Sequence, residues 1–63
     1  MSLVSTADKV ACLRRELALR RNVYAHRVKR RLMDPAQADR EIEVMAEILA
    51  DYESVQADNE AQQ

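Results

Sequence analysis

The side chains that could perform covalent or metal chemistry are few and stand apart. The chain contains one cysteine, Cys12, and one histidine, His26. A nucleophilic thiol needs a base beside it, and no histidine lies one helical turn from Cys12. One cysteine and one histidine cannot complete a zinc site, and a lone cysteine cannot close an intrachain disulfide. We therefore expect Cys12 to be a buried apolar side chain, and we expect no catalytic residue, no metal site and no cofactor.

Four carboxylates in the second half of the chain form another candidate group. Their spacing of four residues places successive members near one another on a helix surface. The group consists of Asp39, Glu43, Glu47 and Asp51. Carboxylate metal sites usually add a histidine or converging backbone oxygens, which this spacing does not provide. The acidic ladder is therefore predicted to be either a solvated helix face or a strip for a basic partner, such as a protein surface that normally binds DNA.

Charge is segregated along the chain, although the formal net charge is only −1. Residues 8–31 hold nine bases and two acids, whereas residues 34–60 hold nine acids and one base. One interpretation is that two oppositely charged helices attract each other along an antiparallel seam. The other is that one half meets a charged partner. The side chains proposed to contact that partner are Arg20, Arg21, Arg27, Arg30, Arg31, Asp39, Glu43, Glu47 and Asp51.

An arginine-rich segment is also a candidate for binding the phosphates of a nucleic acid. Against this, the arginines are spread around the predicted helix, and both tyrosines belong to the predicted core, where they cannot stack on bases. Nucleic-acid binding therefore stays the alternative to protein binding. The sequence argues against a membrane role, because it has no long uncharged apolar run and no basic helix face with large aromatic residues.

Hydrophobic spacing predicts two helices. In the first half, apolar residues recur at steps of three, four and seven, which favours a helix over about residues 8–30. Asp34-Pro35 then interrupts the chain, because proline disfavours helical geometry in the residue before it and suits the first helical position. Asp34 is the predicted N-cap, with Gln37 completing a capping box. A second helix with a heptad seam follows over about 35–55.

The short connection around Leu32 and Met33 forces the two helices to lie antiparallel. The predicted fold class is all-α, an antiparallel two-helix hairpin over residues 7–56 between disordered segments at 1–6 and 57–63. Its seam is expected to contain Leu13, Leu17, Tyr24, Val28, Ile42, Met45, Leu49 and Tyr52. Because the chain has no glycine, Arg30 or Arg31 must adopt the left-handed conformation that often ends a helix, unless the last turn tightens.

The apolar residues outnumber those that one seam can bury. A second row on each helix consists of Cys12, Leu19 and Val23 in the first and Val44, Ile48 and Val55 in the second. On a monomer these rows would form an exposed apolar patch. The sequence therefore predicts a homodimer of hairpins that forms a four-helix bundle, or a hairpin that docks onto a different protein.

Three stretches carry a family resemblance: ELALRRNVY at 16–24, ADREIEVM at 38–45 and ILADY at 48–52. They resemble small uncharacterised proteins encoded by phages and prophages, and the chain is similar in size and style to phage anti-quorum-sensing proteins. Those relatives often have a glycine before the turn, where this chain has Lys29-Arg30-Arg31. The resemblance implies a non-enzymatic protein in the bacterial cytoplasm that binds and inhibits or modulates a host regulator or DNA-binding machine.

Overall fold

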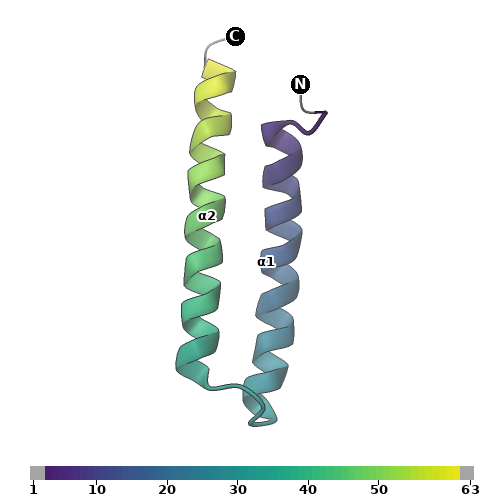
Figure 1. The fold of residues 1–63 in the computed structure, drawn as a ribbon, viewed down its shortest axis with the longest axis vertical. Coiled ribbons are helices and arrows are strands. Elements are labelled where there is room, and N and C mark those ends of the chain that lie inside the picture. Colours follow the sequence, from purple (N-terminus) through teal and green to yellow (C-terminus); the bar gives the residue numbers. More distant parts are fainter. Residues whose placement is uncertain (1–2, 62–63) are drawn as a thin grey trace.

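The chain folds into two antiparallel helices, α1 (Thr6–Lys29) and α2 (Pro35–Ala61), in a computed structural model that describes residues 3–61. The helices lie side by side, and the first turn of α1 and the last turn of α2 lie at the same end of the molecule (Figure 1). The molecule is a rod of 48 × 19 × 16 Å. The predicted all-α helical hairpin is therefore confirmed.

A side chain caps the start of each helix. The Ser5 hydroxyl accepts a hydrogen bond from the Asp8 N–H at 3.0 Å, and the Asp8 carboxylate accepts one from the Ser5 N–H at 3.1 Å. This reciprocal pair is a full capping box. At α2, the Asp34 carboxylate accepts from the Gln37 N–H at 3.3 Å. No hydrogen bond from Asp34 back to the Gln37 side chain occurs in the described chain, so only half of the capping box predicted there forms.

Arg31 takes the left-handed backbone position at the end of α1 that a glycine often occupies. Its φ of 60° is in the left-handed region, while Arg30 before it has a φ of −87°. The Leu32 N–H donates to the Arg27 carbonyl at 2.8 Å, and the Arg31 N–H donates to the Val28 carbonyl at 3.0 Å. These two bonds are the pattern of a Schellman motif, which satisfies carbonyls at a helix end. Of the two arginines considered from the sequence, Arg31 takes the strained position.

The second helix is longer than its apolar pattern predicts. It ends at Ala61 rather than near residue 55, so the prediction of a disordered tail is wrong for residues 57–61. The physical reason is that residues 57–61 read ADNEA: they contain two alanines and a glutamate and neither glycine nor proline, so the helix can continue through Asp58 and Asn59 without burying an apolar face. At the other end, Ser5 and Thr6 are likewise ordered as cap and first helical residue. The predictions for residues 1–2 and 62–63 lie outside the described residues.

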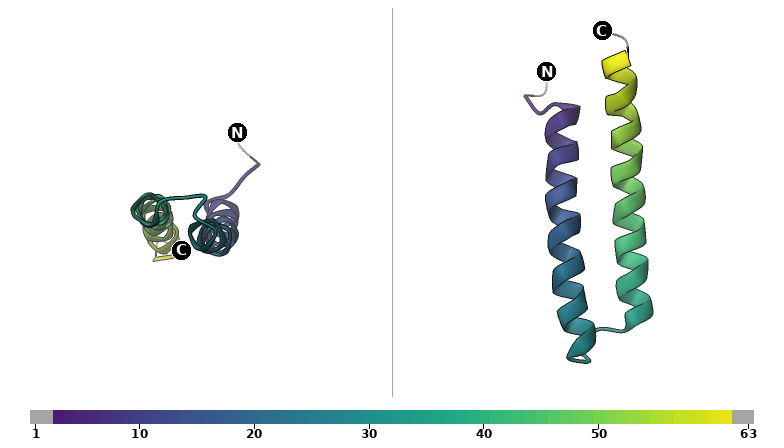
Figure 2. Two further views of the ribbon diagram at one scale, coloured as in Figure 1. Left: turned by 90° about the horizontal axis from the view of Figure 1, so that it is seen from below. Right: turned by 180° about the vertical axis from the view of Figure 1, so that it is seen from behind.

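The core is thin. Only Val10, Leu17 and Ala38 are buried among residues 3–61. All seven other predicted seam residues are half-buried between the helices: Leu13, Tyr24, Val28, Ile42, Met45, Leu49 and Tyr52. The end-on and reverse views show why, since the two helices form a single layer with no third element above or below them (Figure 2). Each seam side chain therefore keeps one edge open to solvent.

Candidate interaction surfaces

The hairpin has two long sides with different chemistry. Helical spacing and the residues that share each hollow divide the surface into these sides. We call one side the polar face; it contains Arg14, Arg21, Ala25, Asp39, Glu43, Ala46 and Glu53. We call the other the apolar face; it contains Val4, Cys12, Leu13, Val23, Val44, Ile48 and Val55. Leu19, which the sequence predicted in the same row as Cys12 and Val23, is nine residues from the buried Val10 and so lies on the outer side of α1. Both faces run the length of the hairpin.

One end of the polar face is closed by an ion pair between the helices. The Arg14 guanidinium donates from Nε at 3.1 Å and from a terminal nitrogen at 2.7 Å, both to the same Glu53 carboxylate oxygen. The two side chains are 61% and 40% exposed, so water screens the attraction. No other ion pair joins the two helices within the part of the chain that the structure describes. This pair links the two helices near the open end of the hairpin.

The other end of the polar face is an open groove of about 650 Å³ beside the turn. Its floor contains Tyr24, Val28, Ala38 and Ile42, and the small side chains of Ala25 and Ala46 keep it from being filled. Arg21 stands on one rim and Asp39 and Glu43 on the other. Across residues 3–61, no hydrogen bond or ion pair joins Arg21 to either acid, so the rim charges are held apart.

The apolar face leaves large side chains in solvent. Val44 is 42% exposed, Ile48 41% and Val55 46%. Cys12 is exposed as well, so the expectation that it is buried is wrong for the single hairpin. The reason is geometric: Cys12 belongs to the second apolar row, which the seam between α1 and α2 does not reach. Three exposed branched side chains on one side of a small hairpin are typical of a surface that another protein covers.

A shallow hollow marks the open end of the apolar face. It has a volume of about 350 Å³ and is lined by Val4, Asp8, Lys9, Cys12, Leu13, Ile48 and Tyr52. The Lys9 ammonium lies 5.7 Å from the centroid of the Tyr52 ring, within the range of a cation–π contact. Lys9 is therefore at the level of Tyr52 along the hairpin, with its charge at the edge of the apolar face.

Arg20 does not belong with the exposed arginines. It is half-buried at the seam, where it fills the seven-residue gap between Leu17 and Tyr24. One terminal nitrogen donates to the Tyr24 hydroxyl at 3.4 Å, and Nε lies 3.8 Å from the Glu16 carboxylate. The signal in the sequence was this gap: a residue at position 20 must face the partner helix, whatever its type.

The remaining predicted basic residues gather at the turn. Arg27, Arg30 and Arg31 are exposed there together with Lys29. Arg27 and Arg30 line a hollow of about 360 Å³ with Val23, His26 and Leu32. The Arg27 guanidinium carbon lies 6.0 Å from the Tyr24 ring centroid, so one base of this group also packs on the seam. We call Arg27, Lys29, Arg30 and Arg31 the basic tip.

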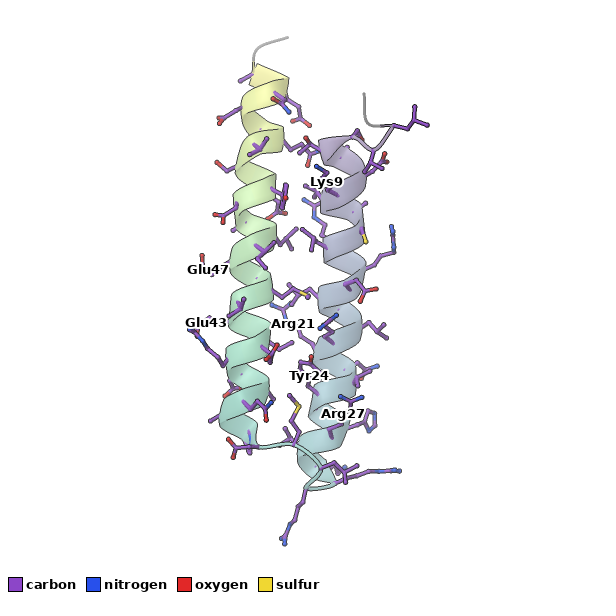
Figure 3. All side chains as sticks on the ribbon, in the orientation of Figure 1. Lys9, Arg21, Tyr24, Arg27, Glu43 and Glu47 are labelled. Carbon is purple, nitrogen blue, oxygen red and sulfur yellow. The ribbon has the colours of Figure 1, made fainter. Side chains whose placement is uncertain are left out.

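The acidic ladder winds around α2 and does not form one strip. Each step of four residues turns about 40° beyond a full revolution, since a helix advances about 100° per residue. Asp39 and Glu43 consequently line the groove of the polar face, and Glu47 lies on the outer side of α2 (Figure 3). Asp51 comes round to the edge of the apolar face. All four are exposed, and Glu43 pairs with Arg40 at 3.4 Å.

The side chains that could bind a metal ion do not gather in the part of the chain that the structure describes. Within residues 3–61, no three His, Cys, Asp or Glu side chains are placed to hold a metal ion. Cys12 and His26 line different hollows at opposite ends of the hairpin. Neither described helix is long and apolar enough to cross a membrane.

Comparisons with known proteins add no family. No protein-family model matches the chain, and no curated protein or solved structure is similar to it at a significant level.

Proposed function

We propose that this chain is a non-enzymatic protein–protein interaction module that works by covering its apolar face with another protein surface. The observation that carries the proposal is the exposure of Val44, Ile48 and Val55 on one side of a hairpin in which only three of residues 3–61 are buried. A two-helix layer with so small a core gains little from its own seam. Covering the apolar face supplies the missing burial.

The proposed occupants include a second copy of the chain, which gives a homodimer in the form of a four-helix bundle, and a protein of the host cell. The resemblance to small phage and prophage proteins supports the second role: inhibition or modulation of a bacterial regulator or DNA-binding machine in the cytoplasm. The charged residues of the polar face, Arg21, Asp39 and Glu43, stay free to contact such a partner when the apolar face is covered.

The test compares one charge placed on each side. Ile48→Glu puts a carboxylate in the middle of the apolar face, and the matched control Ala50→Glu puts the same carboxylate at an exposed position on the polar-face side of α2. Light scattering coupled to gel filtration reports mass, circular dichroism reports helix content, and capture from bacterial lysate reports partners. We expect Ile48→Glu to abolish assembly and capture, while Ala50→Glu retains both. A wild-type chain that is fully folded at its own mass of 7.2 kDa and captures nothing would refute the proposal.

The basic tip favours nucleic-acid binding as a second candidate function. Arg27, Lys29, Arg30 and Arg31 lie within five residues at one end of the rod, so these four bases do not suffer from the spreading around the helix that argues against the others. Duplex DNA titrations at several salt concentrations test it. Binding that falls steeply with salt, and that is lost in Arg30→Ala/Arg31→Ala, supports this function. Absence of binding at low salt removes it.

A further inference from the structure

We infer that the occupant of the apolar face is a second copy of this chain, related by a two-fold axis that runs parallel to the helices. In this arrangement α1 of each copy packs on α2 of the other, and both turns lie at the same end of the dimer. The inference deepens the proposed function by naming the partner at the apolar face, and it rests on that face being an interface.

The first step is the charge pattern on the apolar face itself. On α2, one stripe of residues spaced three and four apart contains three acidic and three apolar side chains: Glu41, Val44, Ile48, Asp51, Val55 and Asp58. On α1, the corresponding stripe contains Lys9, Leu13, Glu16, Arg20, Val23 and Arg27. One stripe is therefore acidic and the other mainly basic. Self-association of this face brings four such stripes together.

The second step is symmetry. When a face stacks on itself with helices aligned, the two-fold axis lies between the copies, either along the helices or across them. An axis across the helices places α1 on α1 and α2 on α2, so acidic stripes meet each other. An axis along the helices places each basic stripe on an acidic one. Helix direction does not discriminate, because neighbouring helices are antiparallel in both cases. The charges of the stripes therefore favour the axis along the helices. This axis also brings the two basic tips together, but their bases are exposed, so water and salt screen that repulsion.

The third step is register. Rotation about an axis along the helices leaves every residue at its own level. Lys9 is level with Tyr52 in its own chain, at 5.7 Å, so it is level with Asp51 of the second copy. Leu13 and Ile48 line the same hollow, so the apolar side chains of the two copies also meet at matching levels. Burial supplies the affinity, while the exposed charges choose the geometry.

The geometry also has a consequence for the turn. In a dimer with the axis along the helices, two basic tips lie side by side and present eight bases at one end. With the axis across the helices, the tips are separated by nearly the 48 Å length of the rod. The distance between equivalent turn residues therefore distinguishes the two arrangements.

The experiment measures that distance with one spin label per chain in the full chain carrying Cys12→Ala. Ala36→Cys places the label at an exposed position in the first turn of α2, and Ala18→Cys places it at an exposed position halfway along α1. The axis along the helices gives distances well below 48 Å from both labels. A turn distance near 48 Å with a short midpoint distance overturns the axis but leaves the interface. No distance from either label overturns the second copy, and lysate capture then tests the proposed function separately.

A mixing experiment tests the contact between Lys9 and Asp51 of the second copy. Lys9→Glu alone and Asp51→Lys alone each place like charges together in their own dimers. In a mixed dimer both contacts become attractive, so the mixture should associate roughly tenfold more tightly than either variant alone. Contacts within one chain are the same in both samples and cannot produce this difference. Equal association of mixed and unmixed samples would overturn the proposed geometry.

Discussion

The polar face and the apolar face of this hairpin are formed by the same two helices and differ in the contacts that join the helices on each side. The polar face is drawn together at one end by Arg14 and Glu53, whose closest atoms are 2.7 Å apart, and opens into a groove where alanines replace larger side chains. Within residues 3–61, no ion pair joins the helices on the apolar face, which exposes Val44, Ile48 and Val55. On the polar face the charged side chains can pair within a single chain, so this side does not need a second surface. A side that exposes branched apolar residues is complete only with a second surface.

The largest effect is expected from removing a buried side chain from the seam, which lies beneath both faces. Leu17 is 5% exposed, so Leu17→Ala should lower the free energy of unfolding by about 2–5 kcal/mol, through lost burial and an unfilled cavity. Because only three of residues 3–61 are buried, this loss approaches complete unfolding. Urea titration followed by circular dichroism measures it.

Leu19→Ala is the matched control outside the seam, because Leu19 is 56% exposed on the outer side of α1. In dilute solution it should cost far less than Leu17→Ala, since little burial is lost. Equal costs for the two variants would contradict the assignment of Leu17 to the seam and Leu19 to the outer side of α1.

Both faces depend on α1 starting where it does. Ser5→Ala removes the hydroxyl that accepts from the Asp8 N–H at 3.0 Å and should cost about 1 kcal/mol of stability. Ser54→Ala, at an exposed interior position of α2, is the control, and it should be neutral or slightly stabilising because alanine is the better helix former. Thermal unfolding curves of the two variants check the difference. A larger loss for Ser54→Ala would refute the capping role.

The end of α1 sets how the two helices align and can be improved. Arg31→Gly should stabilise the hairpin by roughly 0.5–1 kcal/mol, because glycine adopts a φ of 60° without the steric cost that a Cβ atom brings. The neighbouring Arg30→Gly should destabilise it by a similar amount, since Arg30 has an ordinary φ of −87°. Opposite signs in chemical denaturation support the assignment, and two losses would contradict it.

The smallest expected effect compares single carboxylates on the two faces. Glu53→Gln breaks the ion pair with Arg14 and should cost below about 1 kcal/mol, less at high salt, because both partners are substantially exposed. Asp51→Asn removes a carboxylate for which residues 3–61 provide no ion pair or hydrogen bond in the single chain, so it should leave monomer stability unchanged and weaken only self-association. Unfolding and sedimentation measured at two salt concentrations separate these effects. A loss of monomer stability in Asp51→Asn would contradict the assignment of that carboxylate to the edge of the apolar face.

The limits of sequence-based prediction are visible at particular residues. Asp34-Pro35 located the turn, because proline restricts the residue before it and starts a helix well. The end of α2 was misplaced because the prediction followed apolar periodicity, which stops near Val55, whereas the helix continues to Ala61 without it. Arg20 was placed among exposed residues by its charge, although its spacing puts it at the seam. The spacing of four residues predicts one acidic strip only for neighbouring carboxylates, because the excess rotation reaches about 120° over the three steps from Asp39 to Asp51.

The order of residue types along the chain determined the two helices, their antiparallel pairing and the segregation of charge. These features depend on local backbone preferences and on a short connection, which act within a few residues. Only the tertiary structure decided which side of the helix pair carries the ion pair between the helices and which side exposes apolar side chains. That outcome depends on the rotation of each helix about its own axis, and packing of the two helices against each other, through side chains such as Val10, Leu17 and Ala38, fixes that rotation.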